Sequence, residues 1–197
     1  MPYGGPVRIR RRLSDLYWRF SRWTPEAEPL PARSVLIGAP HTSNWDFVLM
    51  VMVSWHVGVP FRFLAKRSVF WEPLGSLMRA LGGIPVDRGQ ESGLTRRLVA
   101  MAEAGEHFVV VITPEATRGK VEHWKSGFYR IARDAGLPVS LGFLDRDRMT
   151  CGIGPTIELT GDVAADMDRI RDFYRGKRGV RPGLESEPRL RDESGSP

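Results

Sequence analysis

Apolar and polar positions along the chain follow two periods, which predict strands and helices in alternation. Short apolar, β-branched runs are typical of strands, and longer segments with apolar residues every three or four positions are typical of helices. The predicted strands are 34–39, 61–65, 83–87, 107–113, 138–144 and a strand or hairpin over 150–159. The predicted helices are 44–56, 71–81, 93–104, 127–135 and 162–174, the last with Asp162 as its N-cap. This alternation predicts an α/β fold with a layered, mostly parallel or mixed sheet flanked by helices.

The segment before the first predicted strand has the pattern of a basic amphipathic helix over 8–23. Its apolar residues form one stripe at helical spacing: Ile9, Leu13, Leu16, Tyr17, Phe20 and Trp23. The other faces carry six arginines and a single acid, Asp15. Such a helix suits a membrane interface. A helix packed on its own domain with a solvated basic face is the alternative.

Length and composition set the expected domain organisation. A chain of 197 residues, 42% of them hydrophobic, is long enough for one domain with a substantial core. We expect an N-terminal helix within 1–24, a linker over 25–31 and a globular domain over 34–178. The remaining segment, 179–197, is polar and rich in proline and glycine, which predicts disorder.

Charge and cysteine usage narrow the expected partners and compartment. The formal net charge of +6 indicates an anionic partner such as nucleic acid, phospholipid headgroups or a phosphorylated substrate. The most apolar stretch, 47–55, is far shorter than the roughly 20 residues that cross a bilayer, and no apolar run follows the N-terminal arginines as in a secretory signal. The single cysteine, Cys151, is compatible with a reducing cytoplasm and is expected to be a small buried residue.

The first group of residues able to carry chemistry runs from 40 to 46, between a predicted strand and a predicted helix. Five residues along an ideal helix span a rotation of about 140°. His41 and Asp46 can therefore meet only if His41 lies before the helix, with Ser43 or Asn44 as N-cap. A carboxylate on one imidazole nitrogen then fixes the tautomer and leaves the other nitrogen as a general base. The purely structural alternative is a capping histidine beside a first-turn acid.

Two further groups follow predicted strands. The loop after 107–113 contains Glu115, Thr117, Arg118 and Lys120, and its two cations suit a phosphate ligand. Arg88 ends another predicted strand beside a glycine, where it can complete a phosphate clamp. A solvated basic loop and a surface ion pair with Asp87 are the respective alternatives.

These groups, in this order, resemble the lysophosphatidic acid and glycerol-phosphate acyltransferase family. The hallmark of that family is H-x-x-x-x-D, which corresponds here to His41 and Asp46 with Ser43 between them. The arginine that ends the family's second block matches Arg88. The family's E-G-T-R-S block is matched by Glu115, Thr117 and Arg118, and its fourth, proline-containing block by 136–139. The resemblance covers roughly 34–145, and several ordered blocks together are more specific than any single motif.

The chain departs from the family pattern at three positions. Ala116 stands at the family's glycine, Gly119 at its serine and Ser140 at the second proline of the fourth block. Because alanine resists positive φ, the loop around Ala116 is expected to differ locally. The pattern resembles a short, one-domain branch of the family, and the departures concern the acceptor more than the reaction.

The resemblance implies a reaction and a set of partners. His41 deprotonates the acceptor hydroxyl while Asp46 holds the imidazole, and the alkoxide attacks the thioester of acyl-CoA or acyl-carrier protein directly. The implied acceptor is a phosphorylated lipid such as a lysophospholipid, and its binding residues are Ser43, Arg88, Glu115, Thr117, Arg118 and Lys120. No metal, no organic cofactor and no nucleic acid is implied. We expect a cytoplasmic protein that binds peripherally to the anionic inner face of the cell membrane.

Three other interpretations use the same residues. A thioesterase or ester hydrolase can use the His41–Asp46 dyad to activate water. A non-catalytic module can bind anionic lipid through the basic helix, although this interpretation gives the ordered dyad no role. A metal site formed by His41, Asp46, His56 and Glu115 is disfavoured, since His56 lies in an apolar helix and is expected to be a core histidine.

Overall fold

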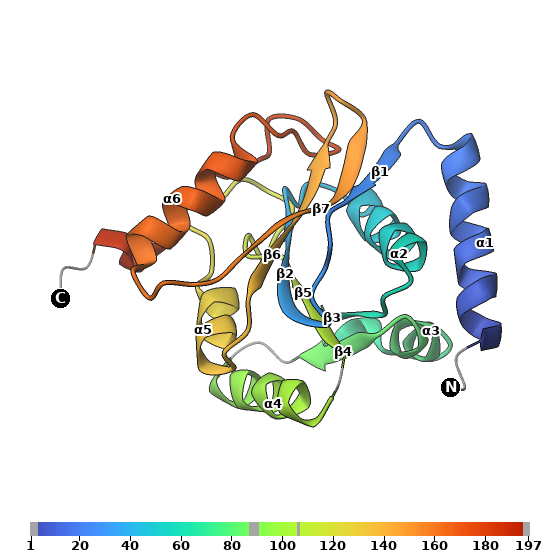
Figure 1. Ribbon diagram of the computed structural model, residues 1–197, viewed down its shortest axis with the longest axis horizontal. Helices are drawn as coiled ribbons and strands as arrows, with labels where there is room; N and C mark the ends of the chain where they lie inside the picture. Colours follow the sequence, from blue (N-terminus) through green and yellow to red (C-terminus); the bar gives the residue numbers. More distant parts are fainter. Residues whose placement is uncertain (1–3, 87–90, 106, 195–197) are drawn as a thin grey trace.

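The computed structural model describes residues 4–86, 91–105 and 107–194, which form a sheet covered by helices on both faces (Figure 1). The strands are β1 Thr24–Ala27, β2 Arg33–Ala39, β3 Phe61–Lys66, β4 Gly83–Val86, β5 Phe108–Ile112, β6 Val139–Asp145 and β7 Thr150–Ile157. The α-helices are α1 Gly4–Phe20, α2 Trp45–Val57, α3 Leu74–Ala80, α4 Glu91–Ala104, α5 Gly127–Asp134 and α6 Val163–Tyr174. Two short 3₁₀ helices lie at Arg67–Val69 and Arg191–Ser194. The predicted α/β fold is confirmed.

The sheet has the strand order β1-β7-β6-β2-β5-β3-β4. All neighbouring strands run parallel except β6 and β7, which are antiparallel. In the centre, Ile37 of β2 is level with Ile112 of β5 and with Leu141 of β6. The carboxyl ends of β2, β5 and β6 therefore lie at the same edge of the sheet, and the loops that leave them are neighbours.

Both faces of the central strands are buried, as expected for a largely parallel sheet. Val35 and Ile37 of β2 belong to a core that also includes Leu98 of α4, Phe128 of α5 and Met167 of α6. Residues of odd and even number point to opposite faces of a strand. Leu36 accordingly packs in a second core on the other face, together with side chains from α1, α2 and α3. Figure 1 shows α4, α5 and α6 on one side of the sheet and α1, α2 and α3 on the other.

Helix α1 packs on its own domain and also exposes an apolar stripe. Ser14 is fully buried and its hydroxyl donates a hydrogen bond to the carbonyl of Met52 in α2 at 2.8 Å. Tyr17 and Trp18 pack against the core beneath the helix. On another face the exposed fractions are 62% for Ile9, 49% for Leu13, 55% for Leu16 and 79% for Phe20. No helix in the described ranges is long and apolar enough to cross a bilayer.

Three segments differ from the sequence-based expectations. Part of the predicted linker over 25–31 forms β1, which pairs in parallel with β7. The helix expected from residue 71 begins at Leu74, directly after a proline. The prediction of disorder from residue 179 is wrong for 179–194, because Val180 and Leu190 pack against the two cores. Residues 179–189 form no helix or strand, but a few apolar side chains are enough to anchor the segment.

Two single residues test the expectations for isolated side chains. Cys151 is fully buried, as predicted, and burial raises the pKa of its thiol to about 12. The prediction of a core position for His56 is wrong. Its side chain is 35% exposed and lies at the interface of α1 and α2, where Nδ1 is 3.7 Å from Asp15 Oδ1 and the ring meets the edge of Trp18.

Candidate active site

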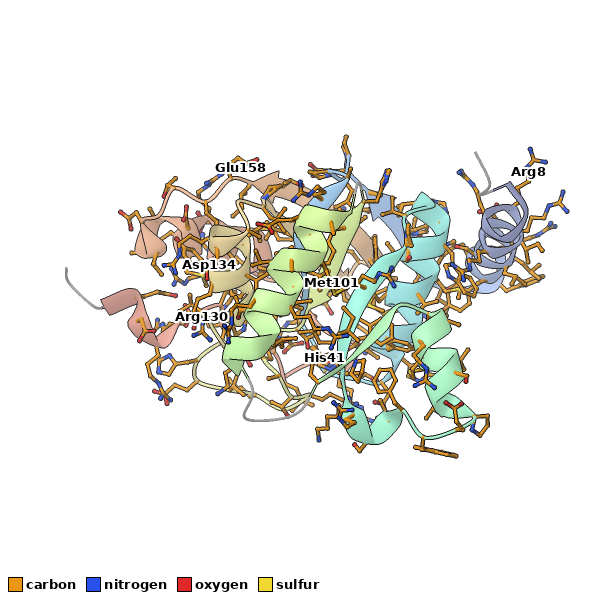
Figure 2. All side chains as sticks on the ribbon, turned by 90° about the horizontal axis from the view of Figure 1, so that it is seen from below. Arg8, His41, Met101, Arg130, Asp134 and Glu158 are labelled. Atoms are coloured by element: carbon orange, nitrogen blue, oxygen red, sulfur yellow. The ribbon has the colours of Figure 1, made fainter. Side chains whose placement is uncertain are left out.

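His41 and Asp46 form a hydrogen-bonded pair at the carboxyl end of β2. His41 Nδ1 lies 3.0 Å from Asp46 Oδ2, and the side chains are 20% and 8% exposed. The short loop after β2 places the histidine before α2, so its ring folds back onto the first turn of the helix, as the spacing predicts. With the proton on Nδ1, the Nε2 nitrogen has a lone pair available for a substrate proton. In Figure 2, His41 lies near the centre of the view, and Arg8 of α1 lies at the margin.

Asp46 is fixed by more than the histidine. Its Oδ2 atom also accepts hydrogen bonds from the backbone N–H groups of Thr42 at 2.7 Å and Ser43 at 2.8 Å. The Ser43 hydroxyl in turn accepts from the N–H of Trp45 at 3.2 Å. Asn44 occupies the N-cap position, but its side chain makes no capping hydrogen bond. The loop between β2 and α2 therefore surrounds the carboxylate of Asp46, which belongs to the first turn of α2. These hydrogen bonds hold His41 in one orientation.

Glu115 joins the two motif-bearing loops. It follows β5, the neighbour of β2, and its Oε2 accepts a hydrogen bond from the backbone N–H of His41 at 2.9 Å. The side chain is only 3% exposed. Burial raises the pKa of Glu115 from 4.5 to about 8, the His41 hydrogen bond opposes this rise, and the charges of Asp46 and Glu185 add to it. At neutral pH this carboxyl group is therefore protonated in most of the molecules.

Ala116, which stands at the position of the family's glycine, has a left-handed backbone conformation. Its φ is 57°, in the left-handed region that alanine adopts only at a cost of about 1–2 kcal/mol. The backbone is therefore strained at Ala116, and the neighbouring Glu115 contacts the backbone of His41. The expected local difference from the family stays a prediction.

The remaining predicted binding residues are three on the loop after β5 and Arg88. Thr117, Arg118 and Lys120 are exposed on the loop after β5, and the Thr117 hydroxyl accepts from the N–H of Gly119 at 3.4 Å. No hydrogen bond or ion pair within the described part of the chain joins these three side chains to His41 or Asp46. Arg88 lies outside the described residues. The described ranges also contain no group of three or more His, Cys, Asp or Glu side chains placed to hold a metal ion.

A third segment at this edge, the chain from 178 to 190, was not predicted from the sequence. The backbone N–H of Arg181 donates to the Thr42 hydroxyl at 3.0 Å, next to the His41–Asp46 pair. Thr42 is fully buried. The available signal was the apolar residues Val180, Leu184 and Leu190 within a polar stretch, which indicate an anchored segment rather than a disordered one.

The site thus has the parts needed for proton transfer at the edge of an α/β sheet: a histidine fixed by a carboxylate, a buried acid behind it and exposed cations nearby. Residues 24–140 match the model of the Acyltransferase family. This range is more than half of the chain, which therefore belongs to that family, and the protein is an acyltransferase. The family-level resemblance found in the motifs is confirmed.

The fold is also similar to that of a solved structure, the 1-acyl-sn-glycerophosphate (LPA) acyltransferase PlsC from Thermotoga maritima. The TM-score is 0.55 at 20% sequence identity, and the match covers 79% of this chain and 70% of that chain. At this identity the likeness concerns the fold. No curated protein sequence matches the chain.

Proposed function

We propose that the enzyme transfers a fatty acyl group from a thioester, acyl-CoA or acyl-carrier protein, to a hydroxyl of a phosphorylated lipid acceptor. The observation that carries this proposal is the contact of 3.0 Å between His41 Nδ1 and Asp46 Oδ2 at the end of β2. The Acyltransferase family match supports the reaction class. The structurally similar Thermotoga maritima protein is a 1-acyl-sn-glycerophosphate (LPA) acyltransferase, which supports a lysophospholipid-like acceptor as the first to test.

The mechanism follows from the free Nε2 nitrogen of His41. Nε2 takes the proton of the acceptor hydroxyl, and the resulting alkoxide attacks the thioester carbonyl to give a tetrahedral intermediate. The intermediate collapses, the carbon–sulfur bond breaks, and the thiolate receives the proton from the imidazolium. Asp46 keeps the imidazole in the required tautomer and stabilises its positive charge.

Substitutions of the pair test the mechanism. His41→Ala should lower turnover by about 10²–10⁴ through the loss of the general base. Asp46→Asn should also be severe, because the amide can hold the wrong tautomer. His107→Ala, at an exposed histidine before β5, is the matched control and should keep wild-type turnover.

The assay measures release of free thiol with and without acceptor. Acceptor-dependent release together with an acylated product supports transfer. Equal release without acceptor would indicate the hydrolase instead, and near wild-type turnover of His41→Ala would refute the assigned base.

We further propose that Arg118 binds the phosphate of the acceptor. It lies exposed on the loop that carries Glu115, where a guanidinium can form two parallel hydrogen bonds to phosphate. Arg118→Ala should raise the acceptor KM about 3- to 10-fold, with a smaller effect on the donor, whereas Arg97→Ala on the surface of α4 should not. An equal effect on a phosphorylated and an unphosphorylated acceptor would count against this role.

For the membrane, we propose that α1 attaches the enzyme peripherally to an anionic bilayer, at the inner face of the cell membrane. Its exposed stripe of Ile9, Leu13, Leu16 and Phe20 provides apolar area, and the arginines on neighbouring faces provide charge complementarity. A double substitution, Leu16→Ser with Phe20→Ser, tests this more sharply than deletion of the helix. Deletion would also remove Tyr17 and Trp18 from the core.

Vesicle co-sedimentation gives the readout. The wild type should bind anionic vesicles better than neutral ones and be partly released by 1 M salt, where the Debye length falls to about 3 Å. The double variant should bind less, and Asp15→Ser on the same helix should bind at least as well as the wild type. Equal binding of the double variant and the wild type would show that the stripe does not contact the membrane.

A further inference from the structure

The segment 178–190 lies across the carboxyl edge of the sheet. It contacts, one after another, the loops that follow β6, β2 and β5, the three adjacent central strands. The contacts are Arg146 N–H to Arg178 O at 2.8 Å, Arg181 N–H to Thr42 Oγ1 at 3.0 Å and Val121 N–H to Ser186 Oγ at 2.9 Å. The segment therefore borders both loops that carry the His41 and Glu115 motifs.

Its position beside His41 is held closely. A Cβ atom on Gly179 would lie 2.4 Å from Thr42 Oγ1, so only glycine permits this approach without a shift. The carboxylate of Glu185 accepts hydrogen bonds from the N–H groups of Gly179 at 2.9 Å and Gly183 at 2.7 Å. Glu185 thus fixes the turn on which Arg181 lies.

Arg181 is the cation that this turn brings to the site. Its backbone is bound to Thr42, the residue after the proposed general base, and its side chain is exposed. Among the described residues, its guanidinium has no ion pair or hydrogen bond. Arg178, in contrast, lies 3.7 Å from Glu185, and Arg189 lies 3.4 Å from Glu187. A guanidinium without a partner, on a turn whose backbone is anchored to Thr42, is suited to a phosphate group, which it can bind with two hydrogen bonds.

We propose that Arg181 is a substrate-binding residue that contacts a phosphate group of the bound substrate, supplied to the site by the segment 178–190. The inference rests on the proposed acyl transfer to a phosphorylated acceptor. This phosphate group belongs either to the acceptor or to a CoA donor. The experiment below separates them.

Steady-state kinetics with Arg181→Ala, Arg181→Lys and the control Arg189→Ala give the first readout. For Arg181→Ala we expect the KM of the phosphate-bearing substrate to rise about 5- to 10-fold, with kcat changed less than about 2-fold. Arg181→Lys should lie between this variant and the wild type, and Arg189→Ala should match the wild type. A rise confined to the acceptor KM assigns the phosphate to the acceptor, and a rise confined to the acyl-CoA KM assigns it to the donor.

Calorimetric binding of octyl phosphate, octanol and CoA to the full chain gives a second readout that needs no turnover. Arg181→Ala should weaken binding of octyl phosphate or CoA about 5- to 10-fold and leave octanol unchanged. Unchanged binding and unchanged KM values, or an equal loss for octanol, would overturn the proposal. If the wild type transfers no acyl group to any acceptor, the proposed function fails, while the calorimetry still decides whether Arg181 binds phosphate.

Discussion

The buried carboxyl group of Glu115 should make the stability of the enzyme depend on pH. Its pKa is about 8 in the folded protein, against an ordinary value of 4.5, because the side chain is almost completely buried. The difference between these two pKa values corresponds to roughly 5 kcal/mol. This is the free-energy cost of ionising Glu115 in its folded environment rather than in the unfolded chain.

The sign follows from proton binding. Between pH 4.5 and pH 8 the folded protein retains the Glu115 proton, whereas the unfolded chain has released it. The folded state therefore binds more protons in this window, and the free energy of unfolding falls as pH rises through it. Below pH 4.5 both states are protonated, and above pH 8 both are ionised, so the contribution of Glu115 is constant in those ranges.

Glu115→Gln removes the titration and keeps an oxygen that can accept the hydrogen bond of 2.9 Å from the N–H of His41. Denaturant unfolding at pH 5, 6, 7, 8 and 9 measures the difference in the free energy of unfolding between variant and wild type. Between pH 5 and pH 8 the free energy of unfolding of the variant should rise, relative to that of the wild type, by about 3–5 kcal/mol.

Glu158→Gln, at an exposed glutamate labelled in Figure 2, is the matched control. Its stability curve should run parallel to that of the wild type at every pH. If the Glu115→Gln curve is also parallel, then Glu115 does not hold a proton in the folded state and the burial argument is refuted.

Three further substitutions test the fold by thermal or denaturant unfolding. Ala116→Gly relieves a left-handed alanine and, after the added freedom of the unfolded chain, should stabilise by about 0.5–1 kcal/mol; a lower Tm would contradict the strain at this position. Asp162→Ala loses the hydrogen bond from Ala165 N–H at 3.1 Å and should cost about 1 kcal/mol, whereas no change would remove its role as N-cap. Phe128→Ala empties a fully buried position on α5 and should cost about 3–5 kcal/mol, so a loss below 1 kcal/mol would argue against its core placement.

The sequence was most informative where the local pattern determines the structure. The run of β-branched residues in Phe108–Ile112 predicts a strand, and in the structure this strand is buried on both faces. The predicted N-cap Asp162 accepts the expected hydrogen bond from the first turn of its helix. The contact of His41 with Asp46 was predicted on the condition that His41 lies before the helix, because it then needs only a loop followed by one helical turn. These features depend on neighbours within a few residues.

Contacts between distant residues were not predictable in the same way. The hydrogen bond from His41 N–H to Glu115 depends on the pairing of β2 with β5, which the pattern of one sequence does not specify. The attachment of Arg181 to Thr42 depends on a loop without helix or strand, whose composition indicates disorder. In helix α1, periodicity identified one apolar stripe, whereas the buried face is centred on Ser14, a polar residue bonded to α2.

The contact between Thr42 and Arg181 spans 139 residues and so bears on the order in which the site forms during synthesis. At about 5–20 residues per second, a ribosome adds Arg181 about 7–28 s after Thr42. By the end of that interval β2, β5 and both motif loops have been made, and only then is the donor to the Thr42 hydroxyl added. The nascent chain therefore acquires the donor that anchors Thr42, beside the His41–Asp46 pair, only when the segment 178–190 has been translated.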